Sequence, residues 1–466
     1  MKGKAIIELK NINNGEVEIH EEHNIVTDAI YNFVSQNPWG LKNDNGHSPA
    51  AQMCGLGLFQ HAIEENREEY RITQTPLAFA GNFSSTHERE GSIVESNCKT
   101  LANGVQYQYV FGPNQANGQI SAIALLDGTG MTSSFFSAPV PENMTNRRLC
   151  TTNVAVGTPV YFDESQSILY CLKINNSSYT QITDITLNKI KLKDKNYVDI
   201  FAKIPSTNSL CTVESARITL SNDLARGNDI RNVCNWLFIN GGKIHIISPK
   251  RNSYVLLHTE ISMSNGNVNQ YEVDHTQYMT ANGKSFATVN NYRFGSEYTE
   301  STVGFQVNAA PYYNGKIYLP IVNTSDLGTG YISTDILCDY LVVDFNTNNE
   351  IEIKEIRKPR IWGNCIVSNN IVYSYYYSNT LAAASYNWMI DLNTGDCLQF
   401  DGGTASTLIN TCMLALNKDF VLFGYHSKNI GGQIWTNPLK YYTINNIDTI
   451  TKTSEHTLTV TYILYN

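Results

Sequence analysis

A run of four potential metal ligands, His20-Glu21-Glu22-His23, lies near the start of the chain. On a β-strand, successive side chains point to opposite faces, so His20 and Glu22 share one face and His23 lies on the other. The spacing also differs from the helical H-E-x-x-H pattern that binds zinc in metalloproteases. We therefore interpret this run as a solvated strand edge and expect no metal site here.

An enzyme would need a nucleophile, a phosphate loop or a placed pair of carboxylates, and no motif marks any of these. Gly55-Leu56-Gly57-Leu58 begins like a dinucleotide fingerprint, but Gln60 stands where the third glycine belongs. The sequence contains neither G-x-x-x-x-G-K-[ST] nor G-x-S-x-G. A glycosidase uses two carboxylates across a sugar-sized cleft, and no motif singles out such a pair. We expect no catalytic residue and no cofactor.

Aromatic residues are the more suggestive feature, with 28 Tyr, 17 Phe and 5 Trp. Aromatic faces with polar edges suit both stacking on sugars and protein interfaces. For any single one of them, packing in a core is the competing interpretation. Several of these residues fall in one expected strand or near the ends of others, and they are the candidate ligand-binding residues: Tyr375, Tyr376, Tyr377, Trp362 and Trp435.

The charge pattern excludes some partners. Lys189, Lys191 and Lys193 would share one face of a strand, and we favour an edge strand protected by lysine over contact with an anionic polymer. The 33 basic and 42 acidic residues give a net charge of −9. No basic block could neutralise a run of phosphates, so nucleic acid is not an expected partner.

The composition is typical of a β-rich protein with enough apolar residues to form hydrophobic cores. Of the 466 residues, 42% are hydrophobic and only 16% are charged, whereas about 25% charged residues is usual. The ten cysteines are scattered and form no C-x-x-C pair, which indicates reduced thiols made in a cytoplasm. Glu8 interrupts the N-terminal apolar run, so we expect no signal peptide, and no apolar run is long enough to span a membrane.

The N-terminal region is expected to hold strands and a short helix. Asn13-Asn14-Gly15 separates two alternating runs and predicts a β-hairpin over residues 4–22. Thr27 is placed to cap a helix that carries Ile30, Phe33 and Val34. A further helix is expected around residues 58–65, and strands over 105–111 and 118–126. Residues 1–140 are predicted to form a small β-sandwich or α+β module.

From about residue 150, short apolar strands recur between Asn- and Gly-rich turns. Corresponding strands recur at intervals that shorten from about 75 to about 50 residues, and the shorter ones suit the blade of a Kelch-like β-propeller. We expect about 5–7 blades over residues 141–449 and place these strands innermost in their blades. A β-sandwich or β-solenoid would share the alternation. The corresponding positions are Ile168, Ile244, Ile317, Val372 and Leu422.

The end of the chain, Thr457–Leu464, alternates strictly, with Leu458, Val460, Tyr462 and Leu464 on one face. A terminal strand of this kind needs a pairing partner. One option is that it closes the propeller ring. The other is that residues 450–466 return to the N-terminal module, which makes the propeller an insertion.

Three stretches near the chain ends carry a joint pattern. They are residues 2–9 (Lys-Gly-Lys-Ala-Ile-Ile-Glu-Leu) with 14–17 and 24–29, residues 115–125 (Gln-Ala-Asn-Gly-Gln-Ile-Ser-Ala-Ile-Ala-Leu), and residues 451–462. Together they resemble tail proteins of phages that infect low-GC Gram-positive bacteria, including phage-tail-like bacteriocins. The resemblance implies that both chain ends belong to one attachment module. It contains no catalytic motif, so it assigns no active-site residue.

The resemblance and the repeats together favour a virion structural protein at the tail tip or baseplate. Its propeller would recognise a host cell-wall glycopolymer or surface protein, and several copies in one particle would bind by avidity. We expect other tail or baseplate proteins as partners, no membrane insertion and no metal. Two alternatives stay open, a baseplate, collar or decoration protein that contacts only virion proteins, and a wall-polysaccharide depolymerase. The receptor, the blade number and the direction of the propeller are left open.

Overall fold

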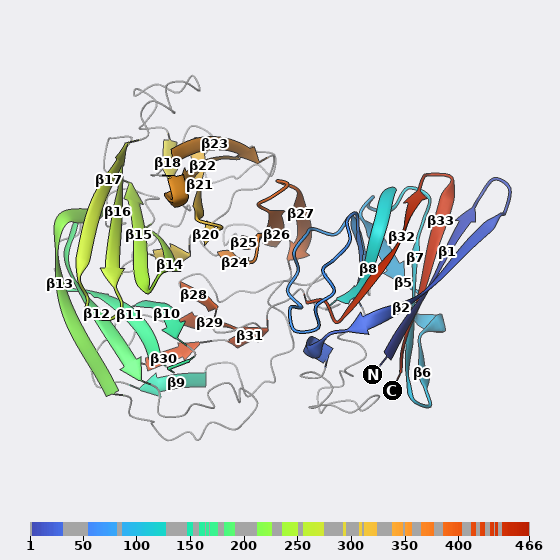
Figure 1. Ribbon diagram of the computed structural model, residues 1–466, viewed down its shortest axis with the longest axis horizontal. Coiled ribbons are helices and arrows are strands. Elements are labelled where there is room, and N and C mark those ends of the chain that lie inside the picture. Colours follow the sequence, from blue (N-terminus) through green and yellow to red (C-terminus); the bar gives the residue numbers. More distant parts are fainter. Residues whose placement is uncertain are drawn as a thin grey trace.

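The computed structural model is built almost wholly from β-strands (Figure 1). None of its described helices is long and apolar enough to cross a membrane. The structure describes residues 2–30, 55–81, 86–126, 147–151, 158–163, 165–166, 168–175, 181–191, 212–225, 235–249, 255–274, 292–294, 307–309, 312–323, 338–347, 350–356, 365–376, 385–402, 412–415, 420–424, 429–432, 434–436 and 440–465.

Nine strands from the two ends of the chain close into a barrel. The order of pairing returns to its start because the last strand pairs with β7 as well as with β1. The terminal segments thus form a closed barrel, where the sequence predicted a β-sandwich or an α+β module. In their order around the barrel, the strands are β33 (His456–Tyr465), β1 (Lys2–Asn11), β2 (Val17–Val26), β32 (Thr443–Lys452), β8 (Gly118–Leu126), β3 (Gly55–Phe59), β4 (Ala78–Gly81), β5 (Glu90–Ile93) and β7 (Gly104–Phe111). A tenth strand, β6 (Lys99–Leu101), pairs with β7 outside this ring.

The terminal strand β33 lies in the barrel along its whole length. It pairs with β1 from Lys2 opposite Tyr465 to Asn11 opposite His456, so the two chain termini lie side by side (Figure 1). The last strand thus pairs with strands of the N-terminal segment, as the second sequence option expected. The alternating face of β33 fills the barrel interior with fully buried side chains, namely Leu458, Val460, Tyr462 and Leu464.

The N-terminal hairpin is confirmed, and it projects beyond the barrel (Figure 1). Gly15 has a φ of +78°, which the turn requires and which glycine adopts readily. β2 pairs with β32 only at Ile25 and Val26. Within the described part of the chain, the rest of its second edge has no strand beside it. His20 contacts Glu18 at 2.8 Å on this edge, as the interpretation of a solvated strand edge requires.

The two predicted helices agree with the structure less well than the predicted strands do. The backbone is helical from Asp28 to Ile30, and Phe33 and Val34 lie outside the described residues. The Thr27 hydroxyl donates to the Tyr441 carbonyl of the returning segment, so it ties two distant segments together. The helix expected over 58–65 is wrong, because β3 is a fully buried strand up to Phe59 and residues 60–65 are not helical. A long run of apolar residues is typical of a doubly covered strand as well as of a helix.

The segment between β8 and β32 forms sheets in which consecutive strands pair antiparallel. Two further strands, β9 (Arg147–Thr151) and β30 (Asn429–Gly432), pair with each other. The first two sheets contain β10 (Thr158–Asp163), β11 (Ile168–Ile174), β12 (Gln181–Lys191) and β13 (Thr212–Ala225), and then β14 (Asn235–Asn240), β15 (Lys243–Pro249), β16 (Val255–Ser262) and β17 (Val268–Asp274), with β19 (Val307–Ala309) added by parallel pairing with β14. The third sheet contains β21 (Lys316–Asn323), β22 (Cys338–Asp344) and β23 (Glu350–Ile356), with β18 (Tyr292–Phe294) and β20 (Tyr312–Tyr313) paired to β21. The last two sheets contain β24 (Cys365–Ser368), β25 (Ile371–Tyr376), β26 (Ser385–Asp391) and β27 (Cys397–Gly402), and then β28 (Cys412–Ala415), β29 (Phe420–Gly424) and β31 (Ile434–Thr436).

The five strands that the sequence aligned with one another are equivalent in the structure. They are β11, β15, β21, β25 and β29, and each has a strand on both of its sides. The sequence placed them innermost, but another strand precedes each of them. In β11 and β15, consecutive residues are buried over 169–172 and 244–248, so both faces of these two strands are covered.

Neighbouring sheets pack face to face through apolar cores. Leu172 and Leu187 of the β10–β13 sheet share one buried cluster with Leu237, Ile244 and Ile246 of the β14–β17 sheet. The start and the end of the inserted segment also meet, because β9 pairs with β30 and β10 lies against β28. The β28–β31 sheet, near the end of the segment, therefore lies beside the β10–β13 sheet, near its start (Figure 1).

The lysine-rich strand is not an edge strand, which corrects the sequence interpretation. β12 carries Lys189 and Lys191 and is paired on one side with β11 and on the other with β13. Lys189 Nζ donates to the Ser264 carbonyl at 2.7 Å, which ties this sheet to the turn between β16 and β17. Lys193 lies outside the described residues.

An arginine of the barrel joins it to the β24–β27 sheet. The Arg89 guanidinium donates to the carbonyls of Pro76 and Leu77 on the barrel side. On the other side it bonds to Asp396 Oδ2 at 3.1 Å and to the Cys397 carbonyl at 3.2 Å. The Thr75 hydroxyl on the barrel side also donates to Asp396 Oδ2 at 2.5 Å, so two residues of that side hold Asp396.

Leu458→Ala is expected to lower the free energy of unfolding by about 2–5 kcal/mol, because it opens a cavity where β33 fills the barrel. Thr459→Ala, on the next and partly exposed position of β33, serves as the matched control and should change it by less than about 0.5 kcal/mol. Urea unfolding followed by tryptophan fluorescence measures both. Equal effects of the two variants would contradict the buried placement of this strand face.

Asp396→Asn is expected to loosen the junction without unfolding either part. The pair with Arg89 is partly exposed, so the loss of stability should stay below about 1 kcal/mol. Small-angle X-ray scattering should show a broader range of arrangements of the barrel and the sheets. Asp184→Asn, which breaks an ion pair within one sheet, should leave the scattering curve unchanged. A wild-type curve for Asp396→Asn would show that the Asp396 carboxylate does not hold the junction.

Candidate functional site

The aromatic residues proposed from the sequence lie on two different sheets. Tyr375 and Tyr376 belong to β25, opposite Asn387 and Tyr386 of β26. Trp435 belongs to β31, opposite Val421. Tyr377 and Trp362 lie outside the described residues. The backbone pairing alone does not bring these positions together.

A different set of side chains does converge in the structure. Within the described residues, His245, His258 and Glu260 form the one group of three potential metal ligands. His245 lies on β15 directly opposite Glu260 on β16. His258 precedes Glu260 by two positions, so all three side chains lie on the same face of the sheet.

The two histidines form a hydrogen-bonded chain. His245 Nε2 lies 3.2 Å from the Asn240 carbonyl oxygen, which can only accept, so this nitrogen carries the proton. His245 Nδ1 is then left with a lone pair, and it lies 3.0 Å from His258 Nε2. The same Nδ1 lies 3.7 Å from Glu260 Oε1. The ligand atoms of the three residues all lie within 4.8 Å of one another.

Burial keeps both imidazoles neutral. It lowers the pKa of His258 to about 4, helped by the neighbouring His245, and it also lowers the pKa of His245. Burial alone would raise the pKa of Glu260, but the hydrogen bond and charge of Lys243 outweigh it and the net shift is downward. Lys243 Nζ bonds to Glu260 Oε2 at 2.6 Å, which leaves Oε1 on the side of the histidines.

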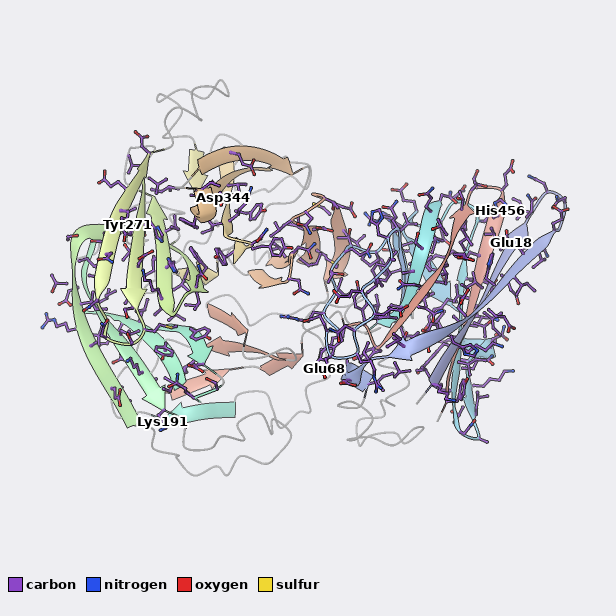
Figure 2. All side chains as sticks on the ribbon, viewed as in Figure 1. Glu18, Glu68, Lys191, Tyr271, Asp344 and His456 are labelled. Carbon is purple, nitrogen blue, oxygen red and sulfur yellow. The ribbon has the colours of Figure 1, made fainter. Side chains whose placement is uncertain are left out.

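Aromatic rings enclose the two histidines. The Phe238 ring stacks on His245 with ring centres 4.6 Å apart, and it stacks on Tyr312 at 4.5 Å. The Phe345 ring lies 4.9 Å from His258. Tyr312 and Phe345 come from the following sheet, so the cluster lies between two sheets. Figure 2 labels Tyr271 on the sheet of the cluster and Asp344, the neighbour of Phe345, on the next sheet.

The cluster offers two neutral nitrogen ligands and one carboxylate oxygen in a largely dry place. Such a set can hold a transition-metal ion, or it can remain a hydrogen-bonded polar link inside the sheet interface.

The predicted site residues do not include these three. Ile244, the neighbour of His245, served only to mark one of the recurring strands. The available signal was His258-Thr259-Glu260, two ligand types on alternate positions of one strand. The partner His245 comes from another strand, and the register that aligns them cannot be deduced from composition.

Comparisons with known proteins define no family for this chain. No protein-family model and no curated protein matches it. The chain is similar over 67% of its length to 36% of a bifunctional GH43-CE protein of Bacteroides eggerthii, with 10% identity and a TM-score of 0.29. It thus spans only about a third of that protein. Over 75% of its length it is similar to 93% of the AfRom2 CNH domain, with 10% identity and a TM-score of 0.26. Scores of this size do not define a shared fold.

The buried histidines predict a pH-dependent stability. Unfolded histidine binds a proton below about pH 6.5, whereas folded His258 does so only near a pKa of about 4. The unfolded chain therefore holds more protons between these values, and stability falls as the solution is acidified through this window. For His258 alone, the loss from pH 7 to pH 5 should be about 2 kcal/mol.

Urea unfolding at pH 7 and pH 5, in buffer with a chelator, measures this loss. His258→Gln should reduce the difference between the two pH values by about 2 kcal/mol. His20→Gln, at a partly exposed histidine of the barrel, is the control and should keep the wild-type difference. If His258→Gln also keeps that difference, His258 is not held neutral by burial.

Proposed function

We propose that the inserted sheets form a five-bladed β-propeller carried by the terminal barrel. Three features support this arrangement. Consecutive strands of the sheets pair antiparallel, neighbouring sheets pack face to face, and β9 pairs with β30 at the two ends of the segment. The pairing of β9 with β30 joins the two ends of the segment, as the closing of such a ring requires.

On this basis we propose a structural protein of a phage tail or tail-like particle, in which the propeller binds the host cell surface. The observation that carries this proposal is that both chain ends build one barrel and the sheets are inserted between β8 and β32. In such a chain the barrel would attach the protein to the particle, and the inserted sheets would present a binding surface to the host cell. The resemblance of the chain ends to phage tail proteins supplies the class of particle.

The projecting hairpin is the proposed contact with the particle. It exposes large apolar side chains, with Ile12, Val17 and Ile19 showing 51%, 49% and 58% of their surface to solvent. Clustered exposed apolar residues are typical of protein interfaces. Figure 2 shows Glu18 on this hairpin, on the side of the barrel away from the inserted sheets. The anchor and the binding part would thus lie at opposite ends of the molecule.

The proposed ligand is a cell-wall glycopolymer or a surface protein. The low fraction of charged residues suits hydrogen bonding and stacking more than charge steering. Several copies in one particle would raise the apparent affinity by about 10²–10⁴ over a single copy. Tyr375, Tyr376, Tyr377, Trp362 and Trp435 remain the proposed ligand contacts.

Two variants separate anchoring from binding. Ile19→Lys should leave the binding of the labelled full-length protein to Gram-positive cells or purified wall polymer unchanged, but should remove the protein from purified particles. Ile19→Leu, which keeps the apolar contact, is the matched control for assembly. Tyr375→Ser combined with Trp435→Ser should reduce cell binding by about tenfold or more, since stacked aromatic contacts are worth roughly 1–3 kcal/mol each, and should not affect assembly.

The outcomes distinguish the rival functions. Assembly into particles without binding to any sensitive strain would indicate an adaptor that contacts only other virion proteins. Release of reducing ends from wall polymer by the wild-type protein would indicate a depolymerase. Absence from every tail particle would overturn the proposal.

A further inference from the structure

We propose that His245, His258 and Glu260 form a binding site for a divalent transition-metal ion of the zinc class. The proposal rests on the geometry of the cluster and is independent of the proposed role in host binding. Two imidazole nitrogens and one carboxylate oxygen are a ligand set that zinc uses, with a fourth position open to water.

The spacing of the ligand atoms suits one ion. Bonds of about 2.0–2.2 Å in tetrahedral geometry put ligand atoms roughly 3.4 Å apart. His245 Nδ1 lies 3.0 Å from His258 Nε2 and 3.7 Å from Glu260 Oε1. These distances lie on either side of the required value, so a small rotation of the side chains would complete the site.

The surroundings orient the ligands as a metal site requires. A metal-bound histidine usually donates its other N–H to a carbonyl or carboxylate, and His245 Nε2 donates to the Asn240 carbonyl at 3.2 Å. Its Nδ1 lone pair therefore points into the cluster, and His258 would bind through Nε2 in the tautomer that carries its proton on Nδ1. Lys243 Nζ donates a hydrogen bond to Glu260 Oε2 at 2.6 Å, so Glu260 Oε1 remains as the oxygen that faces the metal. The Phe238 ring, stacked on His245 at 4.6 Å, fixes the plane of that imidazole.

The ligand types select the kind of ion. Calcium and magnesium prefer sites built from oxygen, whereas imidazole ligands favour zinc and its first-row neighbours. An ion could reach the cluster past Lys243 and Glu260, whose side chains are 43% and 15% exposed. Both histidines are otherwise covered, at 6% and 5% exposure. Solvent therefore reaches the site on the side of Lys243 and Glu260, whereas the side of the two histidines is shielded from solvent.

A bound ion would join neighbouring strands beneath the next sheet. His245 belongs to β15, and His258 and Glu260 belong to β16. The Phe345 ring of the following sheet lies 4.9 Å from His258. Holding His258 in place would therefore also hold the surface against which that sheet packs. We expect zinc to raise the midpoint of thermal unfolding as well as to bind.

The test uses the full-length protein, stripped with a chelator and titrated with zinc chloride by calorimetry. The wild-type protein should bind one equivalent. Glu260→Gln has the same shape and still accepts from Lys243, so it should fold, and its zinc affinity should fall by about tenfold or more. His258→Gln should act in the same direction. The double variant His20→Gln, His23→Gln removes the exposed His/Glu run of the barrel and should bind zinc like the wild type.

Cobalt(II) identifies the ligands. The cobalt-loaded protein should show the visible bands of a four-coordinate site without the near-ultraviolet band that cysteine thiolates produce, and Glu260→Gln should alter those bands. The proposal is overturned if the wild type binds no stoichiometric zinc, or if Glu260→Gln and His258→Gln both bind it like the wild type. It is also overturned if cobalt binds through thiolates, or if binding disappears with His20 and His23.

Discussion

The pairing of the terminal strand on both of its sides is the constraint on which the rest of the structure depends. β33 bonds to β1 from Lys2 to Asn11 and to β7 from Gly104 to Phe111. Closing a sheet in this way removes the free edges of both neighbours. It also forces residues that are more than 400 positions apart into one core, where the Asn24 side-chain amide donates to the Tyr462 hydroxyl. The two ends of the chain therefore fold as one unit.

The inserted sheets follow from that closure. A segment that leaves the barrel after β8 and returns at β32 must begin and end near the same place, and the pairing of β9 with β30 meets this requirement. Arg89 and Thr75 then join the two parts through Asp396, and Arg89 also does so through the Cys397 carbonyl. An anchor built from the termini and a rigidly attached set of sheets is the arrangement on which the proposed function rests.

The sequence predicted features that local chemistry controls. Asn14-Gly15 marked the hairpin because glycine adopts a positive φ readily, and the strict alternation of Leu458, Val460, Tyr462 and Leu464 marked a half-buried strand. The five equivalent strands were also found, because central strands need continuous apolar runs. Each of these signals lies within a few neighbouring residues.

Features that depend on pairing between distant segments were missed or misassigned. The barrel was predicted as a sandwich because the contact of β33 with β7 has no local signature. Lys189 was assigned to an edge strand because lysine is typical there, but the structure places β13 beside it. The His245, His258 and Glu260 cluster depends on the register of β15 and β16. The binding roles of Tyr375 and Trp435 stay predictions.

An electron cryo-microscopy map of the tail particle that we propose to contain this chain tests the central claim most directly. The account predicts that the barrel and its projecting hairpin lie in contact with the body of the particle, and that the inserted sheets extend outward with a face open to solvent. A map in which the sheets are enclosed by other particle proteins, or in which the barrel points outward, would contradict it.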